Sequence, residues 1–236
     1  MDSDFAKIEN PQFYMFDSII LALGITGAGK SSFLNTLVNY LLANSTRNMK
    51  QYICSSDSQK SHTYCLYYYS VYSSKYNKRF LLVDTPGFSD TYGEYLDRKN
   101  CKEIESFLDT VPCNFSVLYV INSSIKRKTA SIAKSIENAS KLLENRPNVL
   151  ANYMILTFSS DQFHEKTDGV ELDIVQRFNL SGIWAYYSNV FDVDNIFALV
   201  GKLKIKKNNE DLFESYWIRF CTEKLDPLVR NIFNRS

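Results

Sequence analysis

Short apolar runs alternate with amphipathic stretches along most of the chain. The segments Ser18–Leu23, Phe115–Ile121 and Val149–Thr157 are mainly apolar over six to nine residues, which is typical of strands buried on both faces of a sheet. Three more strands are predicted at Tyr64–Tyr72, Arg79–Asp84 and Gly182–Tyr187.

The stretches between these runs carry apolar residues at helical spacing. The clearest pattern lies in Lys30–Ala43, where Phe33, Leu34, Leu37, Val38, Leu41 and Leu42 recur every three to four residues. Further helices are predicted at Asp97–Asp109, Thr129–Asn145 and Val193–Leu203, and one or two amphipathic helices at Asn208–Phe233.

Strands that alternate with helices predict an α/β fold with a doubly wound, mostly parallel sheet. The short connection between Tyr64–Tyr72 and Arg79–Asp84 predicts a hairpin, so one antiparallel edge strand is expected. The predicted organisation is one α/β domain over residues 1–207, with an N-terminal arm at 1–16, and a C-terminal amphipathic helical extension at 208–236.

The composition adds limits to this picture. With 236 residues, 45% of them hydrophobic, the chain has room for one domain and a small appendage. A net charge of +1 gives no electrostatic reason to expect nucleic acid as a partner. The five cysteines form no CxxC pair, which favours reduced thiols and a cytoplasmic location. No apolar run reaches the roughly 18 residues of a membrane helix, so membrane association would need a partner or a surface helix.

The segment Gly24–Ser31 matches the pattern GxxxxGK[ST] in full, between a predicted strand and a predicted helix. Its glycines let backbone N–H groups form a nest for phosphates, and the helix N-terminus adds its positive dipole end. Lys30 would reach the β- and γ-phosphates, and Ser31 would supply a hydroxyl to Mg²⁺. The predicted nucleotide-binding residues here are Gly24, Thr26, Gly27, Ala28, Gly29, Lys30, Ser31 and Ser32.

A second signal is Asp84-Thr85-Pro86-Gly87, which follows a buried strand directly. Asp84 is predicted to hold Mg²⁺ through water, and the Gly87 N–H group to meet the γ-phosphate. Together with the phosphate loop, this segment predicts a binding site for a nucleotide with its magnesium ion.

The combination of GxTGAGKSS and DTPGFxDT resembles the translation-factor-like GTPases, and most closely their branch of septins, immunity-associated GTPases and Toc GTPases. The resemblance covers roughly residues 17–202 and implies a G domain that binds GTP, GDP and Mg²⁺. It also implies a switch threonine that closes on Mg²⁺ and the γ-phosphate. Thr63 is the candidate for this catalytic and metal-binding role, with Ser61 as its competitor.

The guanine-reading motif of such domains is [NT]KxD, and this chain departs from it. After the predicted strand come Thr157, Phe158, Ser159, Ser160 and Asp161, so the spacing is one residue too long and the lysine is missing. Either Thr157 is displaced or the segment 158–161 occupies the motif. Asp161 is predicted to bind the base, and by resemblance to the branch Asn189 would flank it.

The position after Gly87, where many G domains place a glutamine that orients water, holds Phe88. Slow intrinsic hydrolysis is therefore expected. Arg127, in a segment that resembles a box of the immunity-associated branch, would serve as a finger across a dimer. The predicted function is a GTPase switch that assembles as a homodimer or homo-oligomer through its nucleotide face. The alternatives are a GTP-binding scaffold with negligible turnover and an ATP-using P-loop enzyme.

Overall fold

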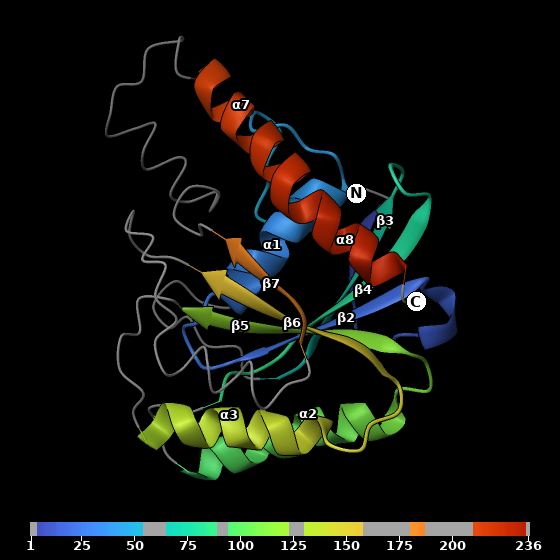
Figure 1. Ribbon diagram of the computed structural model, residues 1–236. Helices are drawn as coiled ribbons and strands as arrows, with labels where there is room; N and C mark the ends of the chain where they lie inside the picture. The colour runs from blue at the N-terminus through green and yellow to red at the C-terminus, as the bar shows by residue number, and fades with distance from the viewer. Residues whose placement is uncertain are drawn as a thin grey trace.

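Seven strands form one sheet in the computed structural model, which describes residues 4–53, 65–88, 94–122, 130–157, 180–186 and 210–234 (Figure 1). The strands are β1 (Phe5–Ile8), β2 (Ser18–Gly24), β3 (Tyr67–Ser73), β4 (Lys78–Asp84), β5 (Phe115–Asn122), β6 (Val149–Thr157) and β7 (Leu180–Tyr186). The helices are α1 (Lys30–Leu41), α2 (Glu94–Thr110), α3 (Ala130–Leu143), α7 (Glu210–Phe220) and α8 (Asp226–Phe233). A short 3₁₀ helix lies at Phe13–Met15.

The spatial order of the strands is β1-β3-β4-β2-β5-β6-β7. The pairs of β2 with β4 and β5, of β5 with β6 and of β6 with β7 are parallel, whereas β3 runs antiparallel to β4. This arrangement confirms the predicted doubly wound, mostly parallel sheet and its single hairpin.

Strand β1 adds a detail that the sequence pattern did not predict. It lies in the segment expected to be an arm and pairs antiparallel with β3, so the antiparallel strand is next to the edge of the sheet and not at it. Four residues are too few to show a periodicity of their own. Their extended conformation is stabilised by pairing with β3, and the Phe5 ring packs against Tyr52 and Tyr69.

Alternate residues of the central strands point into two separate cores. In β2, Ile20 and Ala22 face α1 and the C-terminal helices, whereas Ile19, Leu21 and Leu23 face α2 and α3. Figure 1 shows the corresponding layers, with α1, α7 and α8 on one side of the sheet and α2 and α3 on the other. All seven residues of β2 are buried, as expected for a strand covered on both faces.

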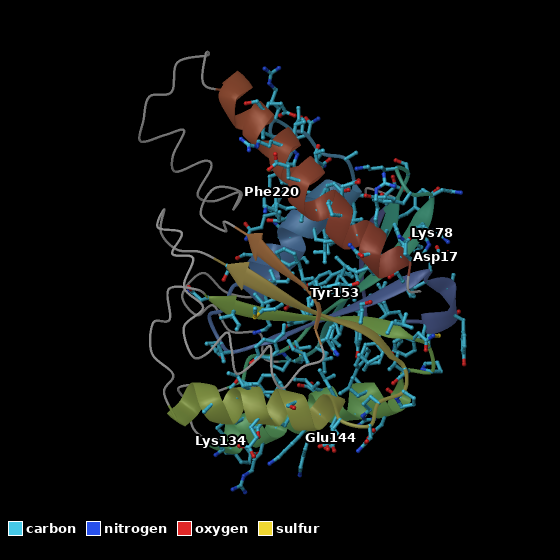
Figure 2. All side chains as sticks on the ribbon, viewed as in Figure 1. Asp17, Lys78, Lys134, Glu144, Tyr153 and Phe220 are labelled. Atoms are coloured by element: carbon cyan, nitrogen blue, oxygen red, sulfur yellow. The ribbon has the colours of Figure 1, made fainter. Side chains whose placement is uncertain are left out.

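The C-terminal helices are docked on the domain through the apolar residues of the tail. Trp217, Phe220, Leu225 and Ile232 are at most 8% exposed and share one core cluster with Tyr153 of the sheet. Figure 2 places Phe220 on the tail above the strand that carries Tyr153. Helices α7 and α8 are joined by a π-helical turn at Cys221–Leu225, which is followed by Asp226 and Pro227 at the start of α8.

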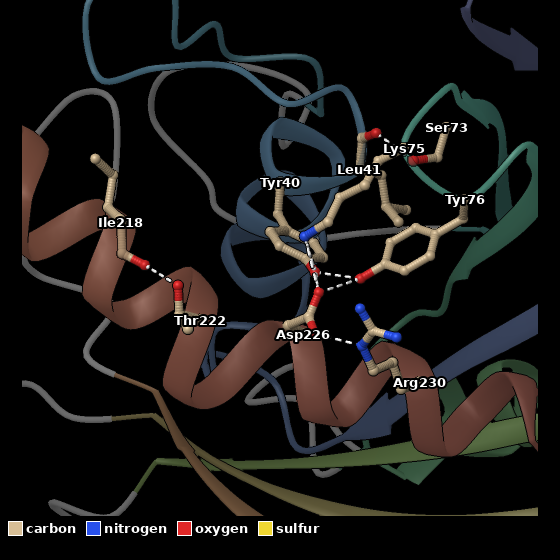
Figure 3. Close-up of polar contacts among 9 residues, drawn as sticks. All are labelled: Tyr40, Leu41, Ser73, Lys75, Tyr76, Ile218, Thr222, Asp226 and Arg230. Atoms are coloured by element: carbon tan, nitrogen blue, oxygen red, sulfur yellow. Dashed lines mark hydrogen bonds and ion pairs between the residues drawn. The ribbon is translucent and has the colours of Figure 1, made fainter.

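A polar cluster fastens this tail to α1 and to the turn of the β3–β4 hairpin (Figure 3). The Asp226 carboxylate accepts hydrogen bonds from Tyr40 Oη (2.7 Å), Tyr76 Oη (2.7 Å) and Lys75 Nζ (2.8 Å), and from Arg230. Partial burial raises the pKa of Asp226, but these four donors outweigh that effect and hold the pKa below its ordinary value. Burial raises the pKa of Tyr76 to about 12; the Asp226 carboxylate adds to this rise, while the bond with Tyr40 acts against it.

Candidate functional site

The phosphate loop between β2 and α1 has a backbone conformation that only glycine adopts without strain. Gly24, Gly27 and Gly29 have φ angles of 149°, 75° and 89°. A Cβ atom on Gly24 would lie 2.3 Å from the Val120 carbonyl oxygen of β5, so this glycine also allows the loop to leave the sheet.

Helix α1 begins immediately after this loop and has no side-chain cap. Its N-cap residue is Gly29, and its first turn holds no acidic residue. The N–H groups of the first turn of a helix have no intrahelical acceptor, and they carry the positive end of the helix dipole. Lys30, Ser31 and Ser32 therefore present donors that fit an anion such as a phosphate.

The Lys30 amine lies over the same loop and is buried at 6% exposure. Its Nζ donates to the carbonyl oxygens of Gly24 (3.2 Å) and Ile25 (3.1 Å). Burial lowers the pKa of Lys30 to about 8, although the negative charge of Asp84 partly opposes this effect. A second negative charge at the loop, such as a phosphate, would favour the protonated amine further.

Ser31 and Asp84 meet where a magnesium ion is expected. The parallel pairing of Ala22 with Asp84 brings the end of β4 beside the end of β2. Ser31 Oγ donates to Asp84 Oδ2 at 2.6 Å, and Asp84 Oδ1 is buried without a hydrogen-bond partner among the described residues. Burial raises the pKa of Asp84, while the Ser31 hydroxyl and Lys30 act against the rise.

These two oxygen groups fit Mg²⁺, which prefers oxygen ligands and retains several waters. A cation close to the carboxylate would stabilise its charged form and give the buried Oδ1 atom a partner. The residues present therefore agree with the predicted metal site, with Ser31 as a direct ligand and Asp84 as a holder of the metal's water.

The segment from Thr85 to Phe88 lies against the phosphate loop. Thr85 Oγ1 donates to the Ala22 carbonyl (2.6 Å), the Phe88 N–H group donates to Gly24 O (3.2 Å), and the Thr26 N–H group donates to Phe88 O (2.9 Å). A Cβ atom on Gly87 would come within 2.5 Å of Thr26 Cα, so glycine is required for this close approach. The Phe88 side chain is 1% exposed and packs in the core beneath α2, so it faces away from a water molecule at the phosphates.

Two further residues contact this site, Thr157 and Asn100, and the sequence did not predict either contact. Thr157 Oγ1, at the end of β6, donates to the Ala28 carbonyl at 2.6 Å and thus joins the predicted base-binding strand to the phosphate loop. Asn100 Nδ2, in α2, donates to the Gly87 carbonyl at 3.0 Å. A single polar residue within an amphipathic helix gives no sequence signal for such a contact.

The structure thus brings together the predicted phosphate-loop residues with Asp84 and Gly87. Four other predicted residues lie outside the described part of the chain, namely Thr63, Arg127, Asp161 and Asn189. The strands that precede three of these residues end at one edge of the sheet, because β5, β6 and β7 run parallel with Asn122, Thr157 and Tyr186 in register. The segments that lead on to Arg127, Asp161 and Asn189 therefore start from the same edge of the sheet as the phosphate loop.

Comparison of the sequence with models of known protein families finds a match to one family. The sequence model of the family described as 50S ribosome-binding GTPase matches residues 19–153. No protein of the curated collection matches.

Similar solved structures include a mutation variant of SsGBP, with 16% identity and a TM-score of 0.43, covering 78% of this chain and 57% of that one. Another is translation elongation factor SelB from Methanococcus maripaludis in complex with the GTP analogue GppNHp. It has 14% identity and a TM-score of 0.45, covering 80% of this chain and 34% of that one.

Proposed function

The chain belongs to the family described as 50S ribosome-binding GTPase, whose model matches more than half of the sequence, and from this premise we propose that it is a Mg²⁺-dependent GTPase switch. Membership makes it a GTP-binding protein with a G domain. The observation that carries the rest of the proposal is the meeting of Lys30, Ser31, Asp84 and Gly87 at one edge of the sheet.

In this proposal the loop N–H groups and the Lys30 amine hold the β- and γ-phosphates. The Ser31 hydroxyl and the water held by Asp84 complete the shell of Mg²⁺, with Thr63 closing the site from the loop before β3. These groups act by position and charge, since phosphoryl transfer needs stabilisation of the negative charge on the transferred group. GTP and GDP then differ in whether Gly87 and Thr63 have a third phosphate to bind.

Selection of guanine is assigned to Asp161, with Asn189 beside the base. Thr157 supports this assignment because its bond to the Ala28 carbonyl fixes the end of β6 against the phosphate loop, four residues before Asp161. The septins, immunity-associated GTPases and Toc GTPases remain the branch that the motifs resemble most.

Hydrolysis by a single copy is expected to be slow, because Phe88 is buried in the core and offers no polar atom to a water molecule. We assign the missing group to Arg127 of a second copy, which would be reached when two molecules meet at their nucleotide faces. No described helix is long and apolar enough to cross a membrane. The proposed place of action is the cytoplasm.

A second candidate function is a GTP-binding scaffold with negligible turnover, which the burial of Phe88 also favours. The third is an ATP-using P-loop enzyme, which stays an alternative because the chain departs from the guanine-reading motif [NT]KxD. Single-turnover assays of GTP and of ATP, with and without Mg²⁺, separate the three. Hydrolysis of GTP alone supports the switch, tight GTP binding without hydrolysis supports the scaffold, and preference for ATP overturns both.

The Lys30→Ala variant is the control for these assays. It removes the amine from the phosphates and should lose nucleotide binding while keeping the circular dichroism spectrum of the folded domain. Equal nucleotide affinity in the variant and the parent would contradict the assignment of the phosphate site.

A further inference from the structure

Asn100 is a polar residue in an apolar layer. It lies on the face of α2 that continues through Ile104, Phe107 and Leu108, all buried against the sheet. Its own side chain is 2% exposed. An apolar residue would pack better at this position, because burying an amide costs free energy unless the amide finds hydrogen-bond partners.

The amide finds only one partner in the described part of the chain. Nδ2 donates to the Gly87 carbonyl at 3.0 Å, whereas Oδ1 is buried with no hydrogen bond. The unsatisfied oxygen costs free energy of folding. What Asn100 adds over an apolar residue of similar size is thus a single donor, and this donor meets the segment that lies on the phosphate loop.

The bond from Asn100 fixes the Gly87–Phe88 peptide from the side of α2. The Phe88 N–H group of the same peptide donates to Gly24 O at 3.2 Å, so its other side is fixed by the phosphate loop. Gly87 is further confined by Thr26, whose Oγ1 atom is 2.3 Å from the place of a Cβ atom. Both ends of this peptide are therefore bonded before any nucleotide binds.

The neighbouring N–H group, that of Gly87, by contrast has no hydrogen bond among the described residues. With the following peptide held on two sides and Gly87 itself packed against Thr26, this donor has little freedom of direction, which lowers the ordering cost of binding a ligand.

We propose that Asn100 is a positioning residue for the third phosphate: by holding the Gly87 carbonyl it fixes the Gly87 N–H group as a donor that a nucleoside triphosphate uses and a diphosphate does not. The inference rests on the proposed function and deepens it.

The test measures the affinity of Mg²⁺ with GDP and with a non-hydrolysable GTP analogue, for the whole chain and its variants. Asn100→Leu removes the donor at similar volume and without the unsatisfied oxygen. Its affinity for the GTP analogue should fall about tenfold, the worth of one well-placed hydrogen bond, while its affinity for GDP stays within about twofold. Asn100→Asp, of the same shape, should give the same split if it folds.

Ser135→Ala is the matched control, since Ser135, like Asn100, is buried and has a side-chain oxygen without a partner among the described residues, but lies in α3. It should leave both affinities unchanged. If Asn100→Leu weakens the two nucleotides equally, or neither of them, the residue has a structural role only and the inference fails. If the unaltered protein binds neither guanine nucleotide, the proposed function itself fails, which is a separate and visible result.

Discussion

A lysine amine enclosed by protein holds its proton less firmly than one in water, and Lys30 is in this condition. Its pKa is lowered to about 8 by burial, so part of the free protein is uncharged at that pH. Phosphates bind the charged form, which means that binding above pH 8 requires uptake of a proton. Affinity for GDP should therefore be constant below the pKa and fall as pH rises through it.

From pH 7 to pH 8.5 we expect affinity for GDP to weaken by about fourfold, as follows from the change in the protonated fraction around a pKa near 8. Fluorescence titration gives the affinity, and calorimetry in two buffers of different ionisation enthalpy gives the proton uptake. Constant affinity without proton uptake at pH 8.5 would mean that Lys30 keeps its charge in the free protein.

Asp161 is the residue whose role the sequence leaves most open, since its motif is one residue too long. If its carboxylate accepts the two N–H donors of guanine, Asp161→Asn should lower the preference for GTP over ATP by about tenfold or more, because one acceptor becomes a donor. Competition between the two nucleotides measures this ratio. Full discrimination in the variant, with its loss in Asn189→Ala, would move base recognition to Asn189.

Residues with a fixed motif could be predicted from the sequence, and residues defined by three-dimensional contact could not. Lys30, Ser31 and Asp84 were assigned from spacing alone, and the structure brings them together. Asn100 bonds to the Gly87 carbonyl, and Thr157 bonds to the carbonyls of Ala28 and Ile121, all outside their own local segments. Such bonds depend on how α2 and β6 pack, and packing leaves no local pattern in the chain.

At the scale of elements, the C-terminal helices are held by a buried indole. Trp217 is 3% exposed, and its Nε1 donates to the Asn44 carbonyl at 2.8 Å. Trp217→Ala should lower the free energy of unfolding by about 3 to 5 kcal/mol, through lost burial and an empty volume. Ile218→Ala is the matched control. The Ile218 side chain, next to Trp217 in sequence, is 56% exposed, so its removal should change stability little. Equal effects of the two substitutions in urea titrations would show that the tail is not docked in solution.

The polar cluster around Asp226 gives the tail a dependence on acid. Because its pKa is lowered in the folded state, Asp226 stabilises the fold fully above the ordinary carboxyl pKa of 3.8, and this contribution decreases as pH falls from that value toward the lower folded-state pKa. The unaltered protein should thus lose more stability between pH 6 and pH 3.5 than Asp226→Asn does. Urea midpoints at the two pH values measure the difference.

The control for that experiment is Glu223→Gln. Glu223 pairs with Arg219 four residues away on the exposed side of the same tail, where such pairs contribute little. This variant should follow the unaltered protein at both pH values. An Asp226→Asn variant that follows it too would show that the cluster has no effect on stability.

Elements with a long periodic pattern were predicted within a few residues, as in α1, β2 and β5. Strand β1 and the π-helical turn were not. The first is four residues long and owes its conformation to β3, and the second has the composition of an ordinary helix. In the turn, the Asp226 N–H group bonds to the Cys221 carbonyl, five residues back. Pro227, which has no N–H group to donate, follows Asp226 in the first turn of α8.

At the scale of the whole molecule, helices cover the two faces of the sheet (Figure 1). The described residues that are predicted to bind the nucleotide lie at the edge where the parallel strands end. Strand β5 ends at this edge, since Val120 pairs with Gly24 at the start of the phosphate loop. The chain that leads to Arg127 therefore starts beside the proposed site. We propose that an arginine this close in sequence to the end of β5 acts on a second copy when two such edges meet.

The expected consequence is that GTPase activity depends on protein concentration. Phe88 gives a single copy no group that orients water, whereas Arg127 of a partner would stabilise the charge of the transition state, an effect worth about 10³ to 10⁵ in rate for arginine fingers. Activity per molecule should therefore rise from nanomolar to micromolar protein in the presence of Mg²⁺ and GTP. Arg127→Ala should abolish the rise and leave nucleotide affinity nearly unchanged, as expected of an interaction made only in the transition state.

Arg219→Ala is the control, because that arginine is exposed on the tail and pairs with Glu223. It removes the same charge elsewhere and should keep the full rise in activity. Light scattering at the same concentrations shows whether the rise coincides with dimer formation, which separates a finger in a dimer from any other effect of concentration. Activity that is constant over the whole range rules out the finger, and if the constant value is also close to zero, the protein is a GTP-binding scaffold and its signal is the bound nucleotide alone.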